Sequence, residues 1–154
     1  MFKIKQYVSR RFCLGCLGCC RYNSNSSIWA PALLDEEKKV LGLEKLEPVV
    51  YRQAYICCFL NPETNLCKIY KRRPWECRLY PFLLNSYNNK IYLSLDLNCP
   101  DIKDKTNTKG FKSYVNYLIQ YLRKPSVVNI LAENRLVFHS YPAGAVINLA
   151  ELEI

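Results

Sequence analysis

Hydrophobic periodicity is clearest in the last third of the chain. Apolar side chains recur there at helical spacing, on one face of a helix that ends before Pro125: Phe111, Tyr114, Val115, Leu118, Ile119 and Leu122. A second short helix is predicted over residues 126–133. The apolar tail, residues 135–154, is expected to pack against the rest of the protein as a strand followed by a helix or a second strand.

The middle of the chain predicts strands. Apolar and polar residues alternate from 90 to 97, and this segment follows 82–87 across Asn88 and Asn89, which is typical of a β-hairpin. A strand is predicted over residues 49–56 and a short helix over 33–43, with three acidic residues in its first turn. The predicted class is therefore α+β. We expect a single domain over residues 1–154, with a cysteine region at 12–100 and a packed C-terminal extension at 101–154.

The number of cysteines exceeds what the size of the chain requires. The sequence has 154 residues, of which 50% are hydrophobic, and a chain of this length can form a core without covalent crosslinks. The N-terminal segment lacks the apolar run of a signal peptide, and no stretch reaches 18 apolar residues. We therefore expect a cytoplasmic protein without a membrane partner, in which the nine cysteines are reduced and serve metal binding or chemistry.

The cysteine spacing predicts a metal site. The first group consists of two overlapping C-x-x-C pairs and an adjacent thiol: Cys13, Cys16, Cys19 and Cys20. The second group contains Cys57, Cys58, Cys67 and Cys77, and Cys99 stands alone before Pro100. The first run matches the opening of the bacterial ferredoxin motif, whose remote cysteine precedes proline. The second group lacks the paired spacing of zinc sites. Iron–sulfur and zinc both remain open, with a mild preference for iron–sulfur.

Disulfide bonding, simple core packing and a catalytic role are less favoured interpretations. An odd number of cysteines and the adjacent Cys19–Cys20 pair argue against a disulfide framework, and four thiols within eight residues are hard to place as simple core side chains. His139, the one histidine, is expected to be a packed or surface residue. No paired carboxylates, nucleophile–histidine arrangement or phosphate-binding loop is visible, so a redox or methyl-transfer enzyme subunit is the least favoured functional hypothesis.

Joined together, these motifs resemble a known family. The segments FCLGCLGCCR, CCFL and CKIYKRRPWECRLYP, followed by Cys-Pro, are similar to the YkgJ-type cysteine-cluster family, a zinc- or iron-chelating domain. The resemblance spans residues 12–100 and implies a [4Fe–4S] cluster or zinc, in a structural or electron-transfer role. It implies eight ligands, Cys13, Cys16, Cys19, Cys20, Cys57, Cys67, Cys77 and Cys99, and makes Cys58 the spare thiol. The chain has Leu17 and Gly18 where the family often has glycine directly after its second cysteine.

Basic residues accompany the cysteines. Pro74 restricts Arg73 and gives a rigid turn that delivers Cys77, while Arg78 and Arg21 each follow a cysteine directly. Guanidinium groups beside a thiolate site can neutralise its negative charge and donate hydrogen bonds to sulfur. Arg21, Arg73, Pro74 and Arg78 are therefore predicted to surround the ligands.

The net charge of +9 is larger than the charge needed to neutralise the metal-bound thiolates. Two four-thiolate zinc sites would lower it by about four, because each site adds two charges and ionises four thiols. Candidate phosphate contacts are Lys3, Lys5, Arg10 and Arg11, with a second basic group at residues 103–112. The alternative function is therefore a zinc-stabilised basic adaptor that binds RNA, a ribonucleoprotein such as the ribosome, or a larger protein complex. A basic surface without a specific partner is the simpler interpretation.

Overall fold

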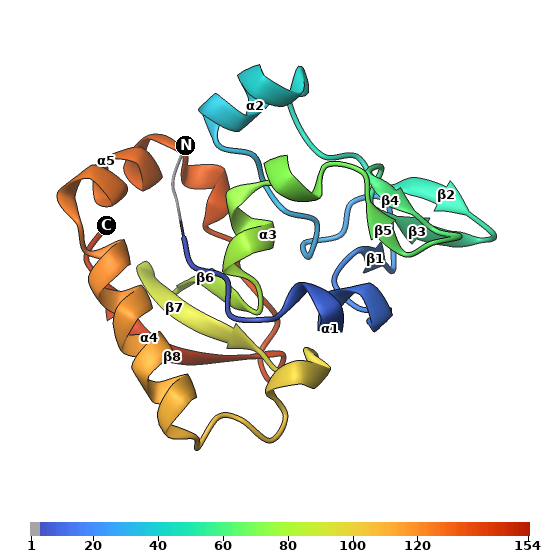
Figure 1. The fold of residues 1–154 in the computed structure, drawn as a ribbon. Coiled ribbons are helices and arrows are strands. Elements are labelled where there is room, and N and C mark those ends of the chain that lie inside the picture. Colours follow the sequence, from blue (N-terminus) through green and yellow to red (C-terminus); the bar gives the residue numbers. More distant parts are fainter. Residues whose placement is uncertain (1–3) are drawn as a thin grey trace.

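The fold is α+β, as the sequence predicts. The computed structural model describes residues 4–154, and this part of the chain contains five α-helices and three small antiparallel sheets (Figure 1). The α-helices are α1 (Arg10–Gly15), α2 (Asp35–Leu41), α3 (Trp75–Leu79), α4 (Lys109–Leu122) and α5 (Pro125–Glu133). The strands are β1 (Arg21–Tyr22), β2 (Val49–Tyr51), β3 (Ala54–Ile56), β4 (Leu60–Asn61), β5 (Leu66–Cys67), β6 (Phe82–Tyr87), β7 (Lys90–Asp96) and β8 (Val146–Leu152). Three 3₁₀ turns complete the set, η1 (Tyr70–Arg72), η2 (Pro100–Ile102) and η3 (Arg135–Val137).

The largest sheet has the order β6-β7-β8. β6 and β7 form the predicted hairpin, and Asn88 and Asn89 have φ angles of 50° and 59°, the conformation that a two-residue turn of this kind requires. The C-terminal tail returns as β8, antiparallel to β7, with a bulge between Leu93 and Ser94. The end of the tail is therefore a strand, which is one of the two expected alternatives. The strand expected before it is not formed, because that part of the tail consists of η3 and an isolated bridge between His139 and Asn85.

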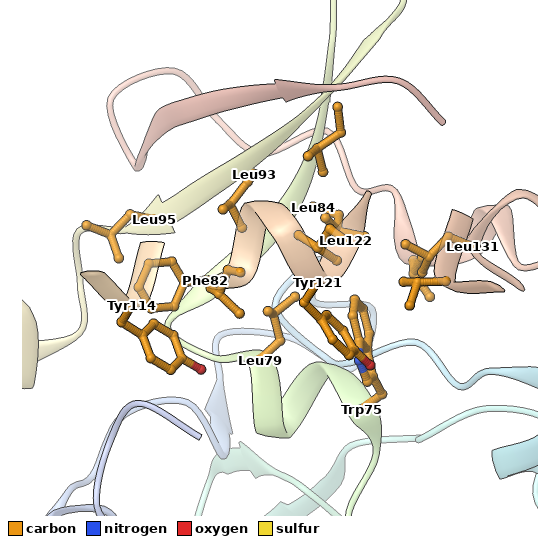
Figure 2. Close-up of a cluster of buried hydrophobic side chains, with 14 of the residues drawn as sticks. Trp75, Leu79, Phe82, Leu84, Leu93, Leu95, Tyr114, Tyr121, Leu122 and Leu131 are labelled. Atoms are coloured by element: carbon orange, nitrogen blue, oxygen red, sulfur yellow. The ribbon is translucent and has the colours of Figure 1, made fainter. Parts of the chain in front are cut away.

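The main hydrophobic core lies between this sheet and the helices (Figure 2). The apolar face of α4 supplies Leu118 and Leu122, both fully buried, and α3 supplies Trp75 and Leu79. α3 packs against β6, so the helix that carries Cys77 is fixed to the largest sheet. The helix predicted from the spacing of residues 111–122 is confirmed.

Two smaller sheets lie near the first cysteine run, with strand orders β1-β3-β2 and β4-β5. The prediction of one continuous strand over residues 49–56 is wrong, because the chain turns between β2 and β3. Arg52 and Gln53 occupy this turn with φ angles of 46° and 66°. Neither residue type is typical of a left-handed turn, so no local pattern indicated the break between the two strands. No helix within residues 4–154 is long and apolar enough to cross a membrane.

Candidate metal centre

Eight of the nine cysteines line one cavity of about 130 Å³. They come from segments far apart in the sequence and are the same eight that the family resemblance implies: Cys13, Cys16, Cys19, Cys20, Cys57, Cys67, Cys77 and Cys99. Cys58 is not among the lining residues, although its neighbour Cys57 is. All nine thiols are free, so no disulfide competes for these sulfur atoms.

Helix α1 and the loop after it position the first cysteine run. The helix begins after Ser9, whose Oγ accepts a hydrogen bond from the Phe12 N–H at 3.2 Å, and Cys16 ends it. The Gly18 N–H then donates to Cys16 Sγ at 3.3 Å. A Cβ atom at Gly18 would lie 3.2 Å from this sulfur, so glycine allows the backbone to approach the thiol closely. Leu17 and Gly18 thus build a tight turn of their own where the family often has glycine alone.

Asn65 holds this loop from the other side. Its Nδ2 donates to the carbonyl oxygens of Leu14 at 2.6 Å and Cys16 at 2.9 Å, and its Oδ1 accepts from Arg21 Nη1 at 2.9 Å. The residue has a φ of 54°, in the turn between β4 and β5. Asparagine in a turn is common, so the sequence alone did not distinguish this residue from other turn residues. Its contacts join the C-terminal end of α1, which carries Cys13 and Cys16, to the turn before the strand that carries Cys67.

Carboxylates fix the helix that carries Cys77. Glu37 Oε1 accepts from the Trp75 N–H at 2.6 Å, at the start of α3, and the same buried carboxylate accepts from the Leu34 N–H at 3.1 Å. Glu76 accepts from the Ala32 N–H at 2.6 Å and lies 3.3 Å from His139 Nε2. Two acidic residues therefore join α3 to segments far away in the sequence.

The remaining cysteines enter the cavity from strands and turns. The Cys57 N–H donates to the Cys20 carbonyl at 2.9 Å, next to the pairing of β1 with β3. Cys67 lies in β5, and Cys99 precedes η2 and is 3% exposed. The backbone thus brings Cys20 and Cys57 side by side although 37 positions separate them. The sequence spacing did not predict this contact.

Burial favours the neutral form of most of these thiols. Desolvation raises the pKa of Cys13 to about 11 and that of Cys57 to about 12, and it also raises the pKa values of Cys67, Cys77 and Cys99. Cys20 is different, because a hydrogen bond from Cys19 lowers its pKa to about 7, with help from Arg21 and Arg73. A metal that binds here must therefore displace protons from several thiols.

Two of the predicted arginines, Arg73 and Arg21, lower the pKa values of cavity thiols. Arg73 lines the cavity, donates to the Tyr70 carbonyl at 3.0 Å and also to Gln6 Oε1, and its charge lowers the pKa of Cys13, Cys20 and Cys67 against the effect of burial. Pro74 lines the cavity as well.

Arg78 points elsewhere. It does not line the cavity, and its Nε donates to the Arg73 carbonyl at 3.0 Å. Its contact thus supports the turn before α3. Arg21 does not line the cysteine cavity either but borders the adjoining cleft.

Aromatic and aliphatic side chains complete the cavity wall. Trp29 and Tyr141 lie with ring centroids 4.8 Å apart, and Phe59 and Leu60 line the same space. No sequence pattern predicted this wall, because Trp29, Phe59 and Tyr141 come from segments without hydrophobic periodicity. An apolar shell around a thiolate site limits water access and tunes the properties of a bound metal.

The donor set fits a thiophilic group. Eight sulfur donors without an imidazole match iron–sulfur clusters or all-thiolate zinc. Within residues 4–154, no group of three or more cysteine, histidine, aspartate or glutamate side chains is arranged around one metal position. The thiols share a cavity without converging on a point, so binding requires their side chains to reorient.

The candidate phosphate contacts are spread over two places. The Lys5 N–H donates to Tyr117 Oη at 3.0 Å, so this segment lies against α4. Arg10 and Arg11 are exposed on α1, where Arg10 lies over the Tyr70 ring at 4.8 Å. Lys3 lies outside the described residues.

The fold and the cavity together define a small cysteine-rich α+β domain. The chain belongs to the CxxCxxCC family, described as "Putative zinc- or iron-chelating domain", which matches residues 12–107. It is also similar to "Uncharacterized protein MJ0661" of Methanocaldococcus jannaschii, with 46% identity over 41 residues. That match covers 27% of this chain and only 22% of the relative's length. No solved structure is significantly similar to the chain.

Proposed function

We propose that the eight cavity cysteines hold an iron–sulfur cluster of the [4Fe–4S] type, in one or two copies, in a structural or electron-transfer role. The gathering of these thiols around one cavity carries the proposal. Five separate segments of the chain contribute cysteines to the cavity. If these thiols were ordinary core side chains, nothing would favour their gathering in one cavity without Cys58. All-thiolate zinc in the same cavity is the alternative occupant.

The donor chemistry favours the cluster over zinc. Structural zinc sites draw their four ligands from closely spaced pairs, whereas Cys57, Cys67 and Cys77 are each ten residues apart. A cluster accepts ligands from scattered positions, and a remote cysteine before proline, such as Cys99, is typical of ferredoxin-type ligation. The bound group would supply one-electron chemistry or structural stability, and the chain would supply thiolates and an apolar enclosure.

Residues of the chain have separate tasks in this proposal. Arg73 and Arg21 offset the negative charge of ionised thiols. Asn65 and Gly18 shape the loop that presents Cys16, and Glu37 anchors α3, which presents Cys77. The aromatic wall limits the access of water.

Adjacent cysteines provide the test. Cys57→Ser removes a cavity thiol, and Cys58→Ser removes a thiol of the same type one residue away that does not line the cavity. We expect Cys57→Ser, purified without oxygen, to lose its bound metal if the cavity holds one cluster and about half of it if the cavity holds two. Cys58→Ser should retain the metal content of the wild type. Equal metal loss in both variants, or normal metal content in Cys57→Ser, would contradict the assignment of the cavity thiols as ligands.

A further inference from the structure

The excess positive charge of the chain lies in two segments that contain no acidic residue. Residues 1–34 and 64–75 carry nine Lys and Arg and neither Asp nor Glu. The other 108 residues hold the remaining 13 basic residues and all 13 acidic residues, which cancel. The whole net charge of +9 therefore belongs to these two segments, which also contain five of the nine cysteines.

The fold packs the two segments against each other. Arg10 on α1 and Arg73 after η1 both lie over the ring of Tyr70, at 4.8 and 3.9 Å from its centroid. Gln6 Oε1 accepts hydrogen bonds from Arg73 and, at 3.4 Å, from the Tyr70 hydroxyl. Asn65 also joins the two segments, because its Nδ2 donates to the carbonyl oxygens of Leu14 and Cys16 at the end of α1. Two stretches of positive charge thus form one surface beside the cysteine cavity.

Four exposed cations lie at or next to this contact in the sequence, and we call them the basic face. Arg10 lies over the Tyr70 ring, Arg11 follows Arg10, and Lys71 and Arg72 follow Tyr70 directly. The partners that orient this surface are neutral, namely an aromatic ring, an amide and backbone carbonyls. None of the four forms an ion pair with a carboxylate anywhere in the described part of the chain, whereas Lys38, Arg52 and other basic residues elsewhere do.

Neutralisation of the thiols does not account for the basic face. Arg21 and Arg73 are the cations that act on the cavity cysteines, and Arg73 is only partly exposed. The four residues of the basic face point to solvent, where their charge is available to a partner. Surface charges of one sign without nearby counter-charges steer a protein of opposite charge.

Apolar surface follows directly after α1. Leu17 is 69% exposed, and its neighbours Gly18 and Cys19 are also exposed. Leu17, Gly18 and Cys19 line a second cleft of about 340 Å³, and Gly18 and Cys19 also line the cysteine cavity. Leu17 shares this cleft with Cys19, Arg21 and Asp96, and it follows the helix that carries Arg10 and Arg11. This segment therefore offers an apolar contact and positive charge close together in the sequence, the two components of protein interfaces.

We infer that the basic face and Leu17 form the docking surface for an acidic partner protein, which would sit over Cys19 at the edge of the cysteine cavity. The inference rests on the proposed function, since a partner at this position is placed to exchange electrons with a cluster held there. Small, salt-sensitive interfaces of this kind are typical of electron-transfer complexes.

A protein partner fits this surface better than single-stranded nucleic acid does. Nucleic-acid surfaces of that type need aromatic rings free for base stacking. The aromatic side chain at the centre of this surface, Tyr70, already has two guanidinium groups over its ring. The exposed apolar residue nearby is Leu17, an aliphatic side chain.

The test uses two labelled polyanions of equal charge and metal-loaded protein at physiological ionic strength. One probe is an oligoglutamate peptide and the other an oligouridylate, with binding followed by fluorescence anisotropy. The variant R10Q/R11Q/K71Q/R72Q removes the basic face. The matched control K103Q/K109Q/K112Q/R123Q removes four exposed cations from the η2–α4 region. Because charges farther apart than about 8 Å are screened at this ionic strength, the effect of each variant is local.

We expect oligoglutamate to bind more tightly than oligouridylate, with an affinity that falls as salt rises. Loss of the basic face should weaken oligoglutamate binding by about tenfold, and the control should change it by less than about twofold. Preference for oligouridylate would overturn the assignment to a protein partner. Equal losses of affinity in both variants, or no binding of either probe, would show that the basic face is not a docking surface. Metal content measured on the same samples tests the proposed function separately.

Discussion

The carboxylate of Glu37 offers a test of how the helix with Cys77 is held. It is 4% exposed and accepts two backbone hydrogen bonds, from Leu34 at 3.1 Å and from Trp75 at 2.6 Å. Glu37→Ala leaves both buried N–H groups without this acceptor, at about 1–3 kcal/mol each. The expected loss in the free energy of unfolding is therefore about 2–6 kcal/mol. Glu37→Gln keeps one acceptor oxygen, so it should cost roughly half as much.

The pH dependence of this loss provides an independent signature. Burial raises the pKa of Glu37 above its ordinary value of 4.5, despite the two backbone hydrogen bonds. A raised pKa in the folded state means that the contribution of this group is complete below pH 4.5 and declines as pH rises through the raised value. The difference in stability between wild type and Glu37→Gln should therefore be largest in acid and smaller at neutral pH.

The assay is guanidinium denaturation followed by circular dichroism, at a fixed and measured metal loading. Comparison with the wild type at each pH removes the pH dependence of metal binding itself, provided that loading is equal. The exposed Glu44→Ala is the matched control and should change stability by less than about 0.5 kcal/mol. If Glu37→Ala changes the free energy of unfolding as little as Glu44→Ala does, the carboxylate of Glu37 does not anchor α3.

Three further predictions concern the core, a turn and the metal. Leu118→Ala, at a fully buried position of α4, should cost about 2–5 kcal/mol while metal content per folded chain stays unchanged, and a loss of metal would contradict the separation of core and cavity. Gly42→Ala, where φ is 65°, should lower the melting temperature through about 1 kcal/mol of backbone strain, and an unchanged melting temperature would show that the helix end has relaxed. Removal of metal with a chelator should increase proteolysis between residues 12 and 77 more than in α4, as mass spectrometry of limited digests would reveal. Uniform digestion would argue that the metal stabilises no particular region.

Local patterns in the sequence were sufficient for the β6–β7 hairpin and for the helices α4 and α5. The spacing of Phe111, Leu118 and Leu122 defines α4, and the two asparagines at 88 and 89 mark the hairpin. These elements follow from periods of 3.6 and 2 residues, which tertiary contacts did not override. The family resemblance implied the same eight cysteines that the cavity gathers, although gathering alone does not establish ligation.

The parts that could not be predicted depend on contacts between distant segments. The turn at Arg52 and Gln53 uses residue types with no preference for positive φ. Asn65 and Glu37 act through hydrogen bonds to backbone groups dozens of residues away, and such pairings have no local pattern. The cavity wall formed by Trp29 and Tyr141 joins two irregular loops from opposite ends of the chain.

The most direct measurement is the iron, acid-labile sulfide and zinc content per chain of protein purified without oxygen. We predict brown protein with iron and sulfide in near-equal amounts. Cys57→Ser should lose all of both if the cavity holds one cluster and about half if it holds two, and Cys58→Ser should keep both. Colourless protein with zinc alone would exclude the iron–sulfur cluster and leave the thiolate zinc site. Protein with neither metal would contradict the claim that the cysteine cavity binds one.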